Sequence, residues 1–207
     1  YLYFSSYSKS WVNHVKHYAN HAAKRFKLDP STQVIEIASN DGYLLQHFKA
    51  RGIPILGVEP AENIAAAAKE KGIPTRVGFF GIEMARAMRE EGLSADLLIA
   101  NNVLAHVPDV HDFVAGLKFL LKPSGRLTLE FPHIQELIDK NQFDTIYHEH
   151  FSYFSFLTAD QIFSKHGLKI YDVERLDTHG GSLRIYLSHA EDQTALISEA
   201  VLTLRRE

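Results

Sequence analysis

Four consecutive residues of this chain bring together a phenol, two imidazoles and a carboxylate: Tyr147-His148-Glu149-His150. Imidazole is the side chain whose unperturbed pKa lies closest to neutral pH, which makes it the usual general base in enzymes. A neighbouring carboxylate can hold the orientation of the ring and stabilise its protonated form. Packing gives no reason to group four titratable side chains, so the run indicates acid–base chemistry.

The elements that must position this run alternate between strands and helices. The apolar pattern predicts strands at 33–38, 53–58, 75–77, 97–100, 126–131, 168–174 and 182–188. It predicts helices at 10–26, 44–48, 61–71, 80–90, 110–121 and 158–166, with Ser10 as the first N-cap and 122–125 closing the fifth helix. Such alternation is typical of a parallel sheet with right-handed crossovers, and the short gap at 177–181 favours an antiparallel final pair. We therefore predict an α/β fold, with a doubly wound, mostly parallel seven-stranded sheet.

Ligands bind such sheets at the carboxyl ends of the strands. The first strand ends in small and polar residues that let the backbone approach a ligand, namely Glu36, Ala38, Ser39, Asn40, Asp41 and Gly42. The second strand ends in Glu59-Pro60, about 20 residues later, where a carboxylate can accept hydrogen bonds from both ribose hydroxyls. A plain turn with a solvated glutamate is the alternative. Ala38 and Ser39 replace the glycines that would cradle a pyrophosphate, which disfavours NAD and leaves room for a nucleoside such as S-adenosylmethionine.

Further cofactor contacts are expected at the same edge. Asn101 and Asn102 end the fourth strand, where an amide or a backbone carbonyl can hold an amino group. Phe79 and Phe80 follow the third strand and either stack on adenine or belong to the core. His106 lies just past the fourth strand, and it is either part of the same active site or an ordinary loop histidine.

Composition excludes several classes of function. The net charge of −3 and the pI of about 6.5 leave no basic stripe for nucleic acid or anionic lipid. Cysteine is absent, so this chain has no disulfide and no thiolate zinc site. No apolar run approaches a membrane span and no signal-peptide pattern is present, so we expect a cytoplasmic protein without membrane or nucleic-acid partners. The chain starts at Tyr1 and stops within a charged run, as a fragment of a longer protein would.

Three segments, 34–45, 57–60 and 101–109, resemble the class I S-adenosylmethionine-dependent methyltransferases. Two more, 147–153 and 178–184, are similar to the sugar C-methyltransferases that act on nucleotide-linked 4-keto-6-deoxyhexoses in deoxysugar biosynthesis. The resemblance covers nearly all 207 residues. It implies the Rossmann-like methyltransferase fold over 31–207, preceded at 1–30 by a lid segment and a helix. The family also carries a cysteine-rich zinc-binding segment and usually a carboxyl-terminal domain, and neither is in this chain.

The resemblance also implies a mechanism. A base removes the proton that the C4 ketone acidifies at C3, and C3 then attacks the sulfonium methyl group. His150 matches the base, Glu149 would orient it, Tyr147 would donate to the substrate or the enolate oxygen, and His106 would share this work. We predict structural roles for His148, His111 and His133 and no metal site, because His148 and His150 have no obvious third ligand. O-methylation of a small molecule and a non-catalytic S-adenosylmethionine-binding module are the alternatives.

Overall fold

The structure, a computed structural model, describes residues 4–207 and is built around one seven-stranded sheet. The strand order is β3-β2-β1-β4-β5-β7-β6; β1 to β5 are parallel, and β7 runs antiparallel to both β5 and β6. The strands are β1 (Val34–Ile37), β2 (Ile55–Glu59), β3 (Thr75–Val77), β4 (Ala95–Asn101), β5 (Leu121–Pro132), β6 (Leu168–Leu176) and β7 (Ser182–His189). The predicted doubly wound, mostly parallel sheet is confirmed.

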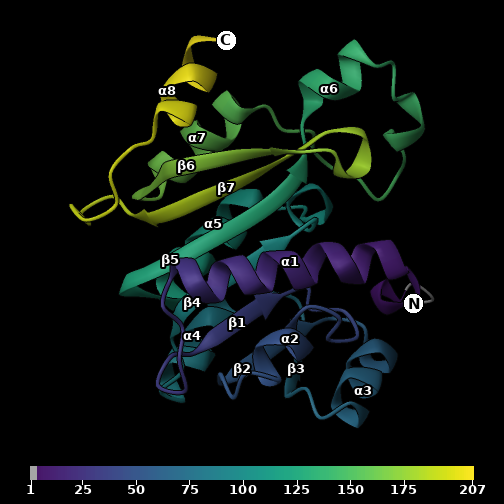
Figure 1. Cartoon of the computed structure of the whole chain (residues 1–207), viewed down its shortest axis with the longest axis vertical. Helices are drawn as coiled ribbons and strands as arrows, with labels where there is room; N and C mark the ends of the chain where they lie inside the picture. Colours follow the sequence, from purple (N-terminus) through teal and green to yellow (C-terminus); the bar gives the residue numbers. More distant parts are fainter. Residues whose placement is uncertain (1–3) are drawn as a thin grey trace.

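Helices cover both faces of the sheet (Figure 1). On one face, α1, α2 and α3 pack over β1 and β4; on the other, α4, α5, α7 and α8 enclose the larger apolar core. The helices are α1 (Lys9–Arg25), α2 (Leu45–Lys49), α3 (Glu62–Glu70), α4 (Ile82–Glu90), α5 (Val110–Leu120), α6 (Ile134–Asp139), α7 (Phe156–Lys165) and α8 (Glu199–Arg206), with 3-10 turns η1 (Ser5–Tyr7), η2 (Leu104–His106), η3 (Phe143–Thr145) and η4 (Thr178–Gly180). Within the described residues, none of these helices is long and apolar enough to cross a membrane.

The structure corrects some predicted boundaries. The N-cap of α1 is Ser8, whose hydroxyl accepts a hydrogen bond from the Trp11 backbone, and not Ser10. The segment 122–125, predicted to close a helix, lies within β5, between Leu121 and Arg126, which pair with Ala95 and Leu97 of β4 across a register shift. The helix α6 was not predicted, because it has only six residues and its apolar spacing, at Ile134, Leu137 and Ile138, covers little more than one turn.

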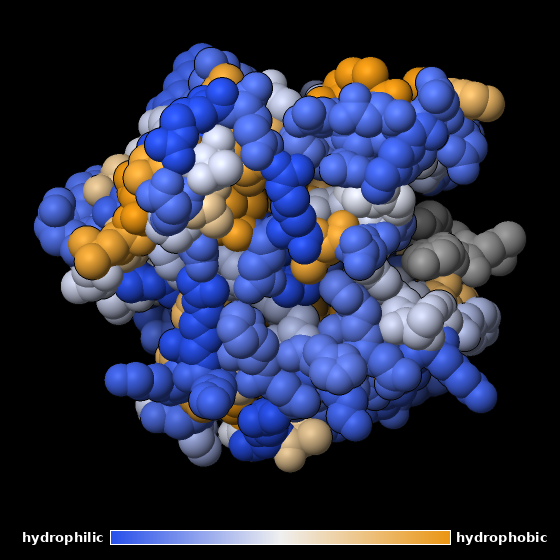
Figure 2. Space-filling view, turned by 45° about the horizontal axis from the view of Figure 1, so that its top comes forward, coloured by the Kyte–Doolittle hydropathy of each residue, from blue (hydrophilic) through white to orange (hydrophobic). Residues whose placement is uncertain are grey.

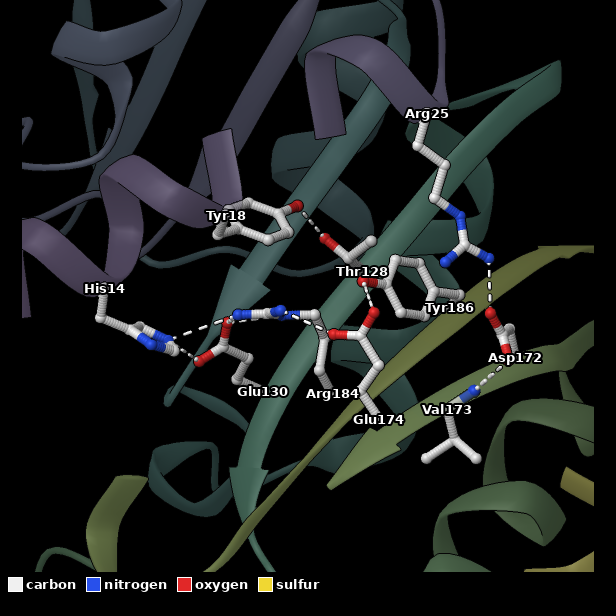
Figure 3. Close-up of polar contacts among 10 residues, drawn as sticks. All are labelled: His14, Tyr18, Arg25, Thr128, Glu130, Asp172, Val173, Glu174, Arg184 and Tyr186. Atoms are coloured by element: carbon white, nitrogen blue, oxygen red, sulfur yellow. Dashed lines mark hydrogen bonds and ion pairs between the residues drawn. The ribbon is translucent and has the colours of Figure 1, made fainter. Parts of the chain in front are cut away.

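A buried polar network joins α1 to the antiparallel end of the sheet (Figure 3). The Arg184 guanidinium donates to Glu130 at 2.8 Å and to Glu174 at 2.8 Å, and His14 Nε2 lies 3.1 Å from the other Glu130 oxygen. Burial alone would raise the pKa of the Glu130 carboxyl, but His14 and Arg184 together lower it. A charged carboxylate buried at the carboxyl end of β5 therefore holds α1 against the sheet.

Candidate active site

Alternate residues of the loop after β1 adopt a left-handed backbone. The φ angles are 55° at Ala38, 48° at Asn40 and 77° at Gly42. Residues other than glycine seldom adopt this backbone conformation. Backbone strain of this kind is concentrated at functional sites. The loop therefore keeps a turn shape that glycine usually provides, although only its last residue is a glycine.

Glu59, at the end of β2, fixes this loop in place. Its carboxylate accepts hydrogen bonds from the backbone N–H of Asn40 at 3.0 Å and of Ala61 at 2.9 Å, and the side chain is almost fully buried. Burial raises the pKa of Glu59 and the two hydrogen bonds oppose that rise. Each carboxylate oxygen retains a second lone pair, so the predicted ribose contact is compatible with this geometry.

Several buried polar groups at the ends of β1 and β4 have no hydrogen-bond partner among residues 4–207. They are Glu36 Oε2, Ser39 Oγ, Asp41 Oδ1 and the side-chain amides of Asn101 and Asn102. Leaving such a group unpaired costs about 1–3 kcal/mol, so the arrangement favours a polar ligand that completes these bonds. Burial, followed by repulsion from Glu59 and Asp41, raises the pKa of Glu36. This concentration of acidic groups suits a ligand that carries positive charge.

The remaining predicted cofactor residues differ in environment. Pro60 is half-buried beside Glu59 and Phe79 is largely exposed, whereas Phe80 packs edge-on against the core residue Phe113 with ring centroids 5.7 Å apart. Phe79 is therefore the aromatic residue free to contact a ligand, and Phe80 belongs to the core.

Part of the predicted lid contacts the loop after β1. The backbone N–H of Ser5 donates to the Asn40 side chain at 2.9 Å, and the Ser6 hydroxyl donates to Asp41, which also pairs with Lys71 at 2.7 Å. Residues 1–3 of that lid lie outside the described residues. The 3-10 turn η1 thus lies on the loop that we assign to the cofactor.

The histidine run and His106 meet in one cluster of rings. The centroid of His150 lies 4.3 Å from Tyr147, 4.8 Å from His106 and 5.9 Å from Tyr153. The segment after β4 and the histidine run are joined by a backbone hydrogen bond from Phe151 to the Ala105 carbonyl at 2.8 Å. Residues separated by more than forty positions in the sequence are thereby brought together.

A backbone carbonyl orients the ring of His150. Its Nδ1 lies 2.8 Å from the Thr145 oxygen, which can only accept, so Nδ1 carries the proton and Nε2 is left as the acceptor. The ring of His150 is therefore oriented by Thr145 and not, as predicted, by Glu149, whose side chain is exposed. Glu149 acts on His106 instead, because the backbone of Glu149 and the charge of its carboxylate both raise the pKa of the His106 ring.

Of the histidines that we predicted to be structural, only His148 is in ring contact with a member of this cluster among the described residues, edge-on to Tyr147 with centroids 6.2 Å apart. His148 is exposed, His111 forms a 2.9 Å hydrogen bond with His166, and buried His133 accepts a hydrogen bond from the Phe156 backbone at 3.3 Å. Sequence reasoning missed Glu130 and Thr145. A lone carboxylate inside the apolar stretch 127–131 is a signal that points to Glu130, whereas a backbone carbonyl leaves no signal in the sequence.

The environment of His106 leads to a testable prediction. Burial, and then the neighbouring His150, lower its pKa from the ordinary value of 6.5, while the backbone and carboxylate of Glu149 raise it. An NMR titration is therefore expected to show His106 gaining its proton only below pH 6.5. His150→Ala should raise that pKa by removing repulsion and exposing the ring, and Glu149→Gln should lower it further. Shifts in the opposite directions would contradict this electrostatic assignment.

Comparisons with known proteins agree with this geometry. A family model described as a methyltransferase domain matches residues 11–173. The chain is 36% identical over 190 residues to the C-methyltransferase NovU of Streptomyces niveus, covering 92% of this chain and 45% of that protein. It is 27% identical over 117 residues to a ubiquinone biosynthesis O-methyltransferase of Rhizobium rhizogenes, covering 51% of this chain and 46% of that protein. The chain thus spans less than half the length of either curated relative.

Among solved structures, the fold resembles magnesium protoporphyrin IX methyltransferase from Synechocystis with bound SAH. The TM-score is 0.66 at 16% identity, and the match covers 86% of this chain and 83% of that chain. At this identity the likeness concerns the fold.

Proposed function

This chain belongs to the methyltransferase domain family, and from that premise we propose that it transfers a methyl group to a carbon atom next to a ketone in a nucleotide-linked deoxysugar. The observation that carries the proposal is the ring cluster around His150, because a non-catalytic binding module has no use for an oriented base. A relative that is itself named a C-methyltransferase supports carbon as the acceptor. The sequence blocks at 147–153 and 178–184 support the sugar class.

The cofactor is S-adenosylmethionine, and the edge formed by β1, β2 and β4 fits it. When bound, it supplies an electrophilic methyl group on a sulfonium centre. We assign Glu59 to the ribose hydroxyls and the amides of Asn101 and Asn102 to the methionine portion, because these amides are buried and unpaired among the described residues. A cationic ligand would offset the repulsion among Glu36, Asp41 and Glu59, so this group of acidic residues favours it over a neutral one.

The acid–base residues then divide the chemistry between them. His150 accepts the C3 proton at Nε2, while the Thr145 carbonyl holds Nδ1–H and stabilises the imidazolium that forms. The C3–H electron pair moves into the enolate. C3 then forms the new bond to the methyl carbon as the sulfur–methyl bond breaks and its electron pair goes to sulfur, and the ketone is restored. Tyr147 packs on His150 and is placed to donate its phenolic proton in a hydrogen bond to the substrate.

An apolar rim adjoins the cluster. Exposed side chains are concentrated in the segment that leads into the histidine run, namely Ile138, Phe143, Ile146, Tyr147 and Phe151. In the view of Figure 2, hydrophobic groups form separate islands in a largely hydrophilic surface. Exposed apolar side chains beside the ring cluster support a substrate pocket at this position, which further groups complete when they cover these side chains.

The position of the new methyl group tests the proposal. We expect full-length protein, given a 4-keto-6-deoxyhexose nucleotide and methyl-labelled S-adenosylmethionine, to form a product whose label is on carbon and whose C3 hydrogen is lost. NMR and mass spectrometry of the product measure both. In deuterium oxide, with the demethylated cofactor in place of the donor, C3 deuteration is expected from the native protein and not from His150→Ala. A labelled methyl on a hydroxyl oxygen, with the C3 hydrogen retained, would overturn carbon transfer in favour of O-methylation.

A further inference from the structure

The turn between β6 and β7 presents an imidazole in an unusual backbone conformation. His179 has φ 51° and ψ 36°, and its side chain is exposed. The next residues, Gly180 and Gly181, also have positive φ, and a Cβ at either would lie within 2.7 Å of Gln142 or Glu136 side-chain atoms. The two glycines are therefore needed to bring this turn against α6. The His179 side chain remains accessible to solvent, although its ring contacts Trp11 edge-on.

One segment clamps both this turn and the proposed base. The Gly180 carbonyl accepts hydrogen bonds from Lys140 at 2.8 Å and from the Gln142 side chain at 2.9 Å. The backbone carbonyl of Gln142 in turn accepts the Thr145 hydroxyl at 2.9 Å, and Thr145 is the residue whose carbonyl orients His150. The segment from α6 to η3 thus fixes the turn that carries His179 and the ring of His150 relative to each other.

A second set of contacts orients the ring of His179 from the other side. Its centroid lies 5.1 Å from Trp11 in an edge-on arrangement, and Trp11 stacks on His14 at 4.9 Å. Trp11 also lies 6.4 Å from Tyr43, the residue after the left-handed loop. His14 is held by Glu130, so the buried network of Figure 3 ends at this aromatic group. In Figure 1 the β6–β7 turn lies between α6 and the N-terminal end of α1, as these contacts require.

His179 therefore lies between the cofactor loop and the proposed base. It is within electrostatic range of His150, Glu130 and His14. The sequence block 178–184 acts as one unit in this arrangement: the Ser182 hydroxyl donates to the Thr178 carbonyl at 2.8 Å across the turn, and Arg184 fixes β7 to Glu130. This turn therefore places the exposed imidazole of His179 beside the proposed active site.

We propose that His179 is a further catalytic residue, which donates a hydrogen bond to the substrate oxygen that becomes negatively charged when His150 removes the neighbouring proton. The proposal rests on the proposed function of the chain. The proton of His179 stays on its nitrogen throughout. The substrate proton goes to His150 Nε2, and the electron pair of the broken C–H bond moves into the enolate. The carbonyl re-forms as the new carbon–carbon bond is made and the sulfur–methyl bond breaks. Donors aimed at developing charge stabilise the transition state more than the ground state.

The left-handed backbone makes His179→Gly a clean test. Glycine adopts positive φ without strain, so the variant removes the ring without the folding penalty that alanine would incur at this position. In full-length protein we expect kcat to fall by about 10²–10³ with KM and S-adenosylmethionine affinity nearly unchanged. Added imidazole should restore part of the lost kcat in the glycine variant and have no effect on native protein.

Matched controls separate this inference from its premise. Lys27→Gly replaces another exposed left-handed residue, with φ 52°, at the far end of α1, and should leave kcat unchanged. His179→Asn keeps a donor in a residue that tolerates this backbone, and should retain more activity than His179→Gly. Native kcat in His179→Gly, or a raised KM with unchanged kcat, would overturn the proposal while native carbon methylation persists. Failure of native protein to methylate carbon would instead overturn the proposed function.

Discussion

Replacement of His150 by alanine is expected to lower kcat by about 10²–10⁴, the usual contribution of a positioned general base. The Thr145 carbonyl fixes the proton on Nδ1, so Nε2 is the atom that accepts the substrate proton, and alanine supplies no replacement. Affinity for S-adenosylmethionine should stay nearly constant, because the residues assigned to the cofactor lie on β1, β2 and β4. Steady-state turnover and calorimetric titration with the cofactor measure the two quantities separately.

Two further variants test the assignment of the base. His148→Ala removes an exposed imidazole from the same run and should leave turnover close to that of native protein. Tyr147→Phe keeps the ring that packs on His150 at 4.3 Å and removes only the hydroxyl, so its loss should be smaller than that of His150→Ala. If His150→Ala turns over at a near-native rate, His150 is not the base and His106, 4.8 Å away, becomes the candidate.

Replacement of Glu59 by alanine is expected to weaken S-adenosylmethionine binding strongly. Hydrogen bonds to a charged group contribute about 1.5–3 kcal/mol each, so one lost ribose contact alone corresponds to roughly a 10- to 100-fold higher Kd. The structure adds a second cost, because the same carboxylate holds the backbone N–H groups of Asn40 and Ala61. Without it, the left-handed loop loses its support, so the melting temperature of the unliganded protein should fall as well.

Calorimetry and thermal unfolding distinguish the two effects of Glu59→Ala. Glu62→Ala serves as the control, since this exposed carboxylate lies three residues further on, in the first turn of α3. It should change neither Kd nor melting temperature appreciably. Unchanged cofactor affinity in Glu59→Ala would remove Glu59 from the cofactor site, and binding of NAD by native protein would contradict the choice of cofactor.

Local patterns determined the overall fold and the edge at which the site lies. Buried parallel strands are short apolar runs separated by helical segments, and this alternation is visible in the sequence without any knowledge of packing. The same alternation places the residues after β1, β2 and β4 at one edge, which is why Glu36, Glu59, Asn101 and His106 were predicted correctly to lie there. The histidine run was conspicuous by residue type alone.

Local conformation was less accessible to sequence reasoning. Asn40 is a residue type that tolerates a left-handed backbone, but Ala38 seldom adopts one, and it does so here because Glu59 and the surrounding strands hold the loop. The helix α6 has only six residues, so its apolar spacing is too short to distinguish a helix from a loop by sequence alone. At Ala38, tertiary contacts override the local preference of the chain.

The roles of individual groups depended on the tertiary structure. The orientation of His150 is set by the Thr145 carbonyl, and every residue carries such a carbonyl, so no sequence pattern distinguishes it. His14 and Glu130 are 116 positions apart, and Trp11 meets His179 only after α1 has packed across the sheet. Residue types and spacing therefore determined the chemistry available to this protein and the edge at which it occurs. Only folding decided which groups act together, because hydrogen bonds and ring contacts between distant segments require a geometry that no local stretch of chain contains.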